Sequence, residues 1–302
     1  MATWSIKPGG GGDFTSCQAA NDSGSVSTGD TLSLDEDSEC QAGTLVLTKG
    51  LSIVAGAGHE ITAPTQAQAT SKARIRAIDG ALAGGDVNVI GIGLNIGNSA
   101  GTFGRCLFAT DDVVVRNCVF NGGGGGGGND QEGIRAFGAA VVVENCAFFG
   151  FNEINGRAIL VVSMTCDIFA TSILTYSGGT QISGIFRFGG TATASGTIIQ
   201  GGDAGSNFRG TVGGDYNVSE DATAPGAGSQ TGVSGSFTTD TVGSEDLALT
   251  ASNAFVDRTG FPVATDLDMS GASVPSSNAD PGCLQFSGTP PSYFPGVLQP
   301  TM

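Results

Sequence analysis

The chain contains few basic residues. Lysine and arginine together number 12 among 302 residues, against 28 aspartates and glutamates, so the formal net charge is −16. Proteins that bind nucleic acids cluster lysine and arginine to displace counterions from phosphates. Here the basic residues are scattered along the chain, so we expect neither a nucleic acid nor an anionic membrane as a partner. A run of about 20 apolar residues, which a membrane-spanning helix requires, is also lacking.

Histidine, tryptophan and tyrosine are scarce as well. The single histidine, His59, has no nucleophile motif beside it, so a Ser-His-Asp arrangement or a zinc site built on it would lack its other members. One tryptophan and three tyrosines do not concentrate in any stretch in the way that aromatic residues line a sugar groove. The sequence therefore predicts no metal site and no cofactor.

The first residues of the chain lack a basic region followed by an apolar region, the pattern of a secretory signal. On this basis the sequence predicts that the protein carries no signal peptide. We expect it to be made in the cytoplasm of its producing cell.

Two stretches of the chain nearly repeat each other. Residues 113–122 (VVVRNCVFNG) and 141–150 (VVVENCAFFG) match at an offset of 28, the difference between 146 and 118. Self-similarity at 20 to 50 residues indicates a solenoid or another repeat architecture. The repeat is rich in β-branched residues, has no 3.6-residue stripe and ends in glycine, so each unit is predicted to be a strand and a turn. Strands stacked in this way form a β-solenoid.

The repeat positions predict columns of identical side chains inside the solenoid. Cys118 and Cys146 occupy one such position, and Cys166 is predicted to continue it as a buried thiol ladder. Parallel side chains one strand spacing apart are poorly placed for a disulfide, so we expect a packing role for these thiols. The pairing of Cys17 with Cys40 stays open.

Further columns follow from the same alignment. Asn117 and Asn145 predict a ladder of stacked amides along the solenoid axis, and Phe120 and Phe148 predict a stacked pair of rings. Residues 87–94 align with 113–120 at an offset of 26, and Ile168 aligns with Phe148 at an offset of 20. Unequal offsets indicate that the turns differ in length while the strands keep their register.

Candidate acid–base groups are sparse. Asp111 and Asp112 are the best local pair, but adjacent residues on a strand face opposite ways, whereas a glycosidase requires two carboxyl groups that face one substrate. Arg116 and Glu144 occupy equivalent repeat positions, which predicts an opposite-charge pair about 5 Å apart on the surface. We interpret both features as structural and assign no catalytic residue.

The two ends of the chain differ in composition from the middle. Residues 1–12 end in Pro8 and four glycines, which predicts a flexible arm on which Trp4 contacts a partner or docks on its own domain. Residues 287–302 contain four prolines and are predicted to be extended, with Tyr293 and Phe294 as partner-binding residues. The seven glycines of residues 122–128 predict a surface loop, with a contact to a neighbouring subunit as the alternative.

The N-terminal third resembles a known family. Residues 13–20 (DFTSCQAA), 28–34 (TGDTLSL) and 50–58 (GLSIVAGAG) are similar to the opening of pectate-lyase-like right-handed parallel β-helix proteins. The pattern Thr15-x-x-Gln18 has the form of a capping box and predicts a short helix over residues 14–21. The resemblance implies an all-β chain with one right-handed parallel β-helix over residues 13–286, a short N-terminal capping helix and an irregular C-terminal tail.

The resemblance is strong for fold and weak for activity, because one fold hosts many functions. Our hypothesis is a non-enzymatic structural component exposed on a bacteriophage virion, either a capsid decoration or a fibre-like protein. Its expected partners are capsid or tail proteins and further copies of itself, a trimer being one arrangement, with a host glycan as another ligand. The alternatives are a tailspike-type polysaccharide lyase or glycosidase, which lacks a convincing acid–base pair, and a carbohydrate-binding adhesin.

Overall fold

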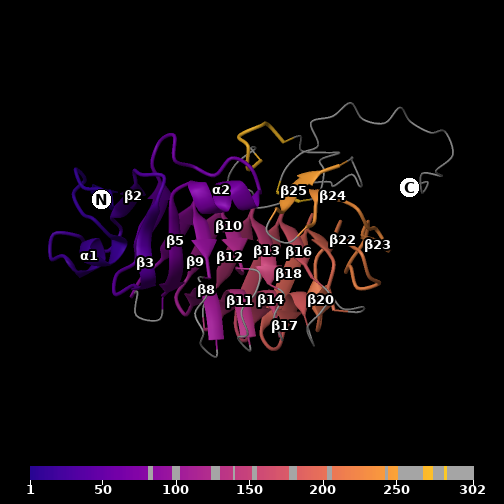
Figure 1. Cartoon of the computed structure of the whole chain (residues 1–302). Helices are drawn as coiled ribbons and strands as arrows, with labels where there is room; N and C mark the ends of the chain where they lie inside the picture. The colour runs from indigo at the N-terminus through magenta and orange to yellow at the C-terminus, as the bar shows by residue number, and fades with distance from the viewer. Residues whose placement is uncertain are drawn as a thin grey trace.

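The chain folds as a parallel β-solenoid. The computed structural model describes residues 1–80, 84–96, 103–123, 130–138, 140–151, 155–176, 182–202, 206–241, 244–250, 268–274 and 282–283. These residues make about seven turns, with 47% strand and 5% helix, consistent with a right-handed β-helix (Figure 1). The predicted fold class is confirmed. Among the described residues, no helix is long and apolar enough to cross a membrane.

The first face of the solenoid is a sheet of nine parallel strands. In spatial order these are β1 (Thr3–Ile6), β2 (Thr31–Leu34), β4 (Ser52–Ala55), β6 (Val87–Ile90), β9 (Val113–Arg116), β12 (Val141–Glu144), β15 (Thr165–Phe169), β18 (Thr191–Ser195) and β21 (Val212–Gly213). Their side chains alternate between the core and solvent, as in β9 and β6, which is the pattern of strands with one buried face.

The second and third faces belong to one 14-stranded sheet that is joined through β5 (Arg74–Asp79). The second face holds β7 (Gly93–Asn95), β10 (Val119–Asn121), β13 (Ala147–Phe151), β16 (Ser172–Thr175), β19 (Ile198–Gln200), β22 (Val218–Ser219) and β23 (Gln230–Thr231). The third face holds β3 (Glu39–Val46), β8 (Phe103–Ala109), β11 (Asp130–Ala136), β14 (Arg157–Val161), β17 (Ser183–Arg187) and β20 (Phe208–Arg209).

Two helices and a hairpin lie outside the solenoid. Helix α1 (Cys17–Asp22) stands at the N-terminal end, and α2 (Gln66–Ser71) lies along the same side as the antiparallel hairpin of β24 (Phe237–Thr239) and β25 (Asp246–Leu249) (Figure 1). The hairpin is bonded to the segment that carries α2, since Gln66 N–H donates to the Glu245 carbonyl at 2.9 Å. Helix and hairpin together cover apolar residues on the outside of the second face, including Val119, Phe149 and Leu174.

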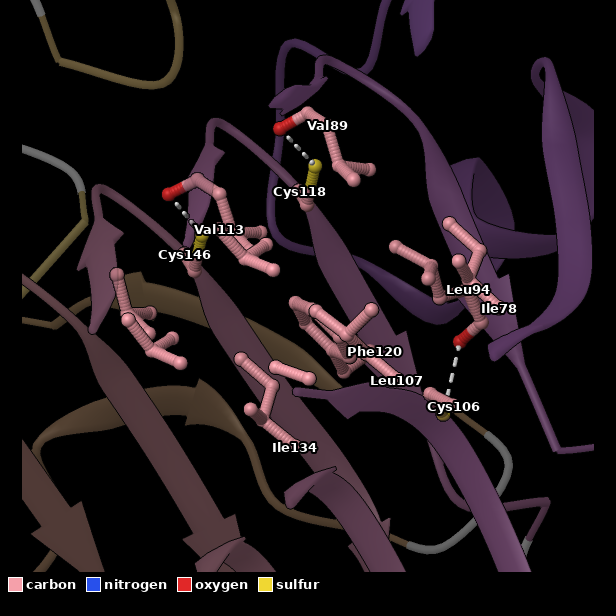
Figure 2. Close-up of a cluster of buried hydrophobic side chains, with 14 of the residues drawn as sticks. Ile78, Val89, Leu94, Cys106, Leu107, Val113, Cys118, Phe120, Ile134 and Cys146 are labelled. Carbon is pink, nitrogen blue, oxygen red and sulfur yellow. Dashed lines mark hydrogen bonds between the residues drawn. The ribbon is translucent and has the colours of Figure 1, made fainter. Parts of the chain in front are cut away.

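The interior of the solenoid is filled by columns of equivalent side chains. Phe120 and Phe148 stack with ring centroids 4.3 Å apart and planes 7° from parallel, and both are fully buried, so the predicted ring pair is confirmed. Cys118 and Cys146 are free and buried, and the Cys118 thiol donates to the Val89 carbonyl at 3.4 Å (Figure 2). Burial raises the pKa of the Cys146 thiol well above its usual value, so this thiol stays protonated.

The register corrects two of the predicted alignments. Val87 pairs with Val113 at the predicted offset of 26, but Ile168 pairs with Val143 and Ile173 pairs with Phe148. Cys166 therefore lies opposite Val141 and does not continue the column of Cys118 and Cys146. The coil between them is three residues shorter than the one before it, so the identical residue type no longer marks the equivalent position.

A column of left-handed residues forms the corner between the first and second faces. Positive φ angles occur in each successive coil at Gly91 (73°), Asn117 (52°), Asn145 (50°), Ala170 (44°), Gly196 (63°) and Tyr216 (56°). Glycine and asparagine adopt this conformation more readily than other residues. The side-chain oxygen of Asn117 accepts no hydrogen bond among the described residues, so the predicted amide ladder is wrong for this pair. The turn geometry explains the repeated asparagine.

The left-handed conformation of Asn117 is expected to tolerate glycine better than alanine. At a φ of 52°, an alanine carries the steric cost of about 1–2 kcal/mol that a β-carbon meets in the left-handed region, whereas glycine costs about 0.4–1 kcal/mol through the unfolded chain. We therefore expect Asn117→Gly to be more stable than Asn117→Ala, by up to about 1 kcal/mol. Denaturant unfolding of both variants measures the difference. Equal losses in the two variants would favour an amide ladder instead.

The N-terminal segment is part of the solenoid, which corrects the prediction of a flexible arm over residues 1–12. Strand β1 pairs in parallel with β2 over its whole length. The Trp4 indole N–H donates to the Asp30 carboxylate at 3.1 Å, and its ring packs edge-on against Phe14 at 5.7 Å. Alternating apolar residues in TWSI supply the strand pattern that the glycines after Pro8 obscured. Trp4 thus docks on its own domain, the second of the two alternatives.

The outer edge of β1 is occupied by the chain that follows it. Ser5 N–H donates to the Asp13 carboxylate at 2.8 Å, and the Ser5 carbonyl accepts from Phe14 N–H at 3.1 Å. Unpaired strand edges recruit other chains. These bonds close part of the N-terminal edge.

Asp30 makes this docking sensitive to acid. Hydrogen bonds from the backbone N–H groups of Ala2 and Ser27 and from the Trp4 indole lower the pKa of Asp30 from 3.8 to about 2. A carboxylate whose pKa is lowered in the folded state stabilises the protein at pH values above its ordinary, unfolded-state pKa. This contribution is lost as the pH falls through the pKa of the folded state. We expect the fluorescence of Trp4, the single tryptophan, to change between pH about 4 and about 2. An Asp30→Asn variant that shows the same titration would contradict this.

Helix α1 begins at Cys17, three residues later than predicted. Its N-cap is Ser16, whose side chain accepts from Ala19 N–H at 3.2 Å, while Gln18 bonds to Asp22 and to the Val46 carbonyl. The capping-box role of Thr15 and Gln18 is therefore wrong, although a helix does stand at the predicted place. Most of the glycine loop, residues 124–129, and the tail over residues 287–302, with Tyr293 and Phe294, lie outside the described residues.

Candidate functional site

The carboxylates singled out in the sequence serve as turn caps. Asp111 accepts from Gly84 N–H at 2.9 Å in the preceding coil, and Asp112 accepts from Ala140 N–H at 3.0 Å in the following one. The two groups therefore point along the axis in opposite directions, and no shared substrate face results. His59 Nδ1 lies 2.9 Å from an Asp37 oxygen at the surface, within an ion cluster that includes Lys72.

The predicted Arg116–Glu144 pair exists, but its acid is buried. The two residues are opposite each other in β9 and β12, with Arg116 Nε 2.6 Å from Glu144 Oε2. Glu144 is fully buried, which corrects the prediction of a surface pair. Such a pair is structural, since a buried charge requires a partner.

The most distinctive concave site lies on the third face, at residues for which the sequence analysis proposed no role. Each strand here turns a corner, so one side chain points out, two point in and the next points out again. Glu132 and Arg135 flank the inward pair Gly133 and Ile134 in this way. A β-carbon at Gly133 would lie 2.5 Å from the Ala158 carbonyl, so the corner requires glycine. The outward residues of successive coils stack into two columns.

These columns form a groove of about 600 Å³, which we call the arginine groove. Its lining residues are Arg105, Asp130, Glu132, Arg135, Arg157, Leu160, Val162, Phe186, Phe188 and Arg209. The register places Arg105, Glu132 and Arg157 in one column and Phe108, Arg135, Leu160, Phe186 and Arg209 in the other.

Glu132 is the anchor of the arginine groove. Its side chain is 1% exposed, and three arginines surround it: Arg105 Nε lies 2.8 Å from Oε2, while Arg135 Nη1 and Arg157 Nη1 lie 3.4 and 3.6 Å from Oε1. Charge-assisted bonds of this kind hold the guanidinium groups in fixed positions. The carboxylate is thereby engaged on both oxygens.

Aromatic rings support the arginines from below and beside. The guanidinium carbons of Arg157 and Arg209 lie 5.3 and 4.6 Å from the centre of the Phe186 ring, and that of Arg105 lies 5.2 Å from the Phe108 ring. These distances fall within the range of cation–π attraction. The side chains of Arg105 and Arg135, which also line the groove, are 31% and 25% exposed.

The arginine groove carries positive charge on an acidic chain. Four arginines against Asp130 and Glu132 give its lining a formal charge of +2, whereas the whole chain carries −16. Burial lowers the pKa of Arg157, which indicates that its charge is poorly hydrated. Arg157 Nε is buried and has no hydrogen-bond partner among the described residues. The groove is thus suited to accept an anion.

Both carboxylates of the arginine groove are engaged by neighbouring side chains. Glu132 is bonded to arginines, and Asp130 accepts from the Asn155 amide at 2.8 Å. The described residues also contain no group of three or more side chains able to hold a metal ion. What the arginine groove offers a ligand is a row of fixed donors beside apolar walls.

One sequence signal could have revealed this site. Arg105, Glu132 and Arg157 are separated by 27 and 25 residues, close to the repeat period, so charges of alternating sign recur once per coil. This recurrence is hard to recognise because the residues around the three positions are not similar in sequence. Comparison of the chain with models of protein families, with curated proteins and with solved structures finds no significant match.

Proposed function

We propose that the protein is a non-enzymatic structural component of a bacteriophage virion, of the pectate-lyase-like β-helix kind, displayed as a capsid decoration or fibre-like protein. The observation that carries this proposal is the state of the carboxylates in the arginine groove. Both are engaged in ion pairs or hydrogen bonds within the chain, so neither carboxylate is placed to transfer a proton to a substrate. The rigid stack of coils suits such a role.

A second candidate function is adhesion to an acidic glycan of the host. It is favoured by the formal +2 charge of the arginine groove. Arginine recognises carboxylates through paired N–H groups. This candidate shares the groove with the first and differs in the ligand.

Particle composition tests the proposed function. Phage particles purified from a host that expresses this gene are expected to contain the protein at a fixed copy number, accessible to antibody on intact particles. Incubation of the purified protein with host capsule is expected to release no oligosaccharide. Absence of the protein from purified particles would refute the virion role, and steady release of oligosaccharides would establish an enzyme in its place.

A further inference from the structure

We infer that the arginine groove and the apolar corner beside it form one docking surface for an extended acidic segment of a partner polypeptide. The inference rests on the proposed function, because a structural virion protein is held in place by contacts to other proteins. It adds the class of partner and the surface that receives it.

The apolar corner follows the third face in successive coils. Phe137 comes directly after β11, Val162 after β14 and Phe188 after β17, at equivalent positions of the register. Phe137 and Phe188 are 45% and 74% exposed, and Met164 in the same turn as Val162 is 54% exposed. Exposed apolar residues that gather in one place mark interaction sites. Val162 and Phe188 also line the arginine groove, so corner and groove are continuous.

The residue types at this surface are those of protein interfaces. Arginine, phenylalanine and methionine are enriched in interface cores, where lysine, aspartate and glutamate are depleted. No lysine lines the arginine groove, and its two acids are engaged. A saccharide would supply anionic groups for the arginines but little apolar surface to cover Met164 and Phe188. A partner with both carboxylates and apolar side chains matches both parts.

Backbone strain points to the same corner. Met164 has a φ of 69°, a backbone conformation that residues other than glycine, asparagine and aspartate rarely adopt. Residues held in such conformations cluster at functional sites. Here the strained turn carries an exposed methionine beside the apolar corner.

The spacing of the arginines sets the length of the segment. Arg105, Arg135, Arg157 and Arg209 stand on β8, β11, β14 and β20, and four strand spacings separate the first of these strands from the last. At about 4.8 Å per spacing this is about 19 Å, the length of roughly six extended residues. Alternate residues of an extended segment face the same way, about 6.7 Å apart. Carboxylates at alternate positions would therefore face the arginines.

A short synthetic peptide tests the inference on the full-length protein. The probe is an amidated hexapeptide of alternating aspartate and leucine, with a fluorophore on its N-terminus for anisotropy. The first control is the same peptide with asparagine for aspartate, and the second probe is trigalacturonic acid, measured by calorimetry. We expect the acidic peptide to bind more tightly than its asparagine form by about tenfold, and its affinity to fall as salt screens the charges.

Variants of the protein locate the binding. Arg135→Gln is expected to weaken the acidic peptide about tenfold and Phe188→Ser about fivefold, since each removes one class of contact. Matched controls are Lys72→Gln and Val46→Ser, which remove a charge and an exposed apolar side chain at other places and should leave affinity unchanged. Circular dichroism confirms that each variant is folded.

The outcomes separate the explanations. Binding that is lost in Arg135→Gln and Phe188→Ser and retained in the controls supports the inference. If only trigalacturonic acid binds, the inference is overturned and the groove is an acidic-glycan site. If the peptide binds equally well to the groove variants, the inference is also overturned, because the peptide then binds elsewhere. No binding of either probe overturns it as well. Because these assays use the purified protein, they can fail while the particle test succeeds, or the reverse.

Discussion

Phe148→Ala is expected to lower the free energy of unfolding by about 3–5 kcal/mol. The ring is fully buried. Its centroid lies 4.3 Å from that of the stacked Phe120 ring and 6.4 Å from that of Phe151. It also covers Gly133, whose missing β-carbon would lie 2.9 Å from the Phe148 ring. Glycine has no side chain that could move into the space, so the cavity persists and the cost stays at the upper part of the range.

Equilibrium unfolding in denaturant, followed by circular dichroism, measures this loss. The matched control is Phe188→Ala, which removes the same ring from a position 74% exposed and should change stability by no more than about 0.5 kcal/mol. If the two variants lost equal stability, the stacked column would not be the core of the solenoid.

Arg116→Ala is expected to cost about 3–5 kcal/mol, because it removes the guanidinium that is bonded to a buried carboxylate. Glu144 is fully buried, and Arg116 Nε lies 2.6 Å from it. Removing one partner of a buried pair leaves the other charge less well compensated, whereas replacing both by apolar groups is often close to neutral.

A double-mutant cycle tests this reasoning. The variant with Arg116→Met and Glu144→Leu together is expected to be more stable than Arg116→Ala alone, and to approach the parent protein. Thermal unfolding of the parent, Arg116→Met, Glu144→Leu and the double variant gives the coupling between the two sites. Additive losses in the double variant would mean that the ion pair contributes little and that the arginine stem supplies the stability.

Much of the fold could be predicted because the interior repeats. Two nearly identical stretches around Cys118 and Cys146 revealed the solenoid, since stacked coils place equivalent residues in one column. The prediction failed where a turn changed length, as at Cys166, because residue identity then pointed to the wrong column. It also failed at Trp4, where strand pairing to a distant segment decides the structure and the local glycines indicate only flexibility.

The candidate site was largely hidden from the sequence. Arg105, Glu132 and Arg157 are far apart in the chain and have dissimilar neighbours, and their meeting depends on the strand register. The sequence did reveal one equivalent pair, Arg116 and Glu144, because the residues around it repeat. Its burial could not be predicted, since alternation along the strand placed it outside and only the surrounding coils cover it.

The partly closed edge of β1 affects how copies of this protein can pair end to end. A β-solenoid whose end strands are unpaired can bind the end strand of another copy, and repeated binding of this kind would give a polymer. Here Asp13 and Phe14 form hydrogen bonds with the backbone N–H and carbonyl of Ser5, so these two groups are not available to a strand of another copy. Copies that pair through this part of the edge must first displace them, so end-to-end pairing through Ser5 of β1 is expected to be disfavoured.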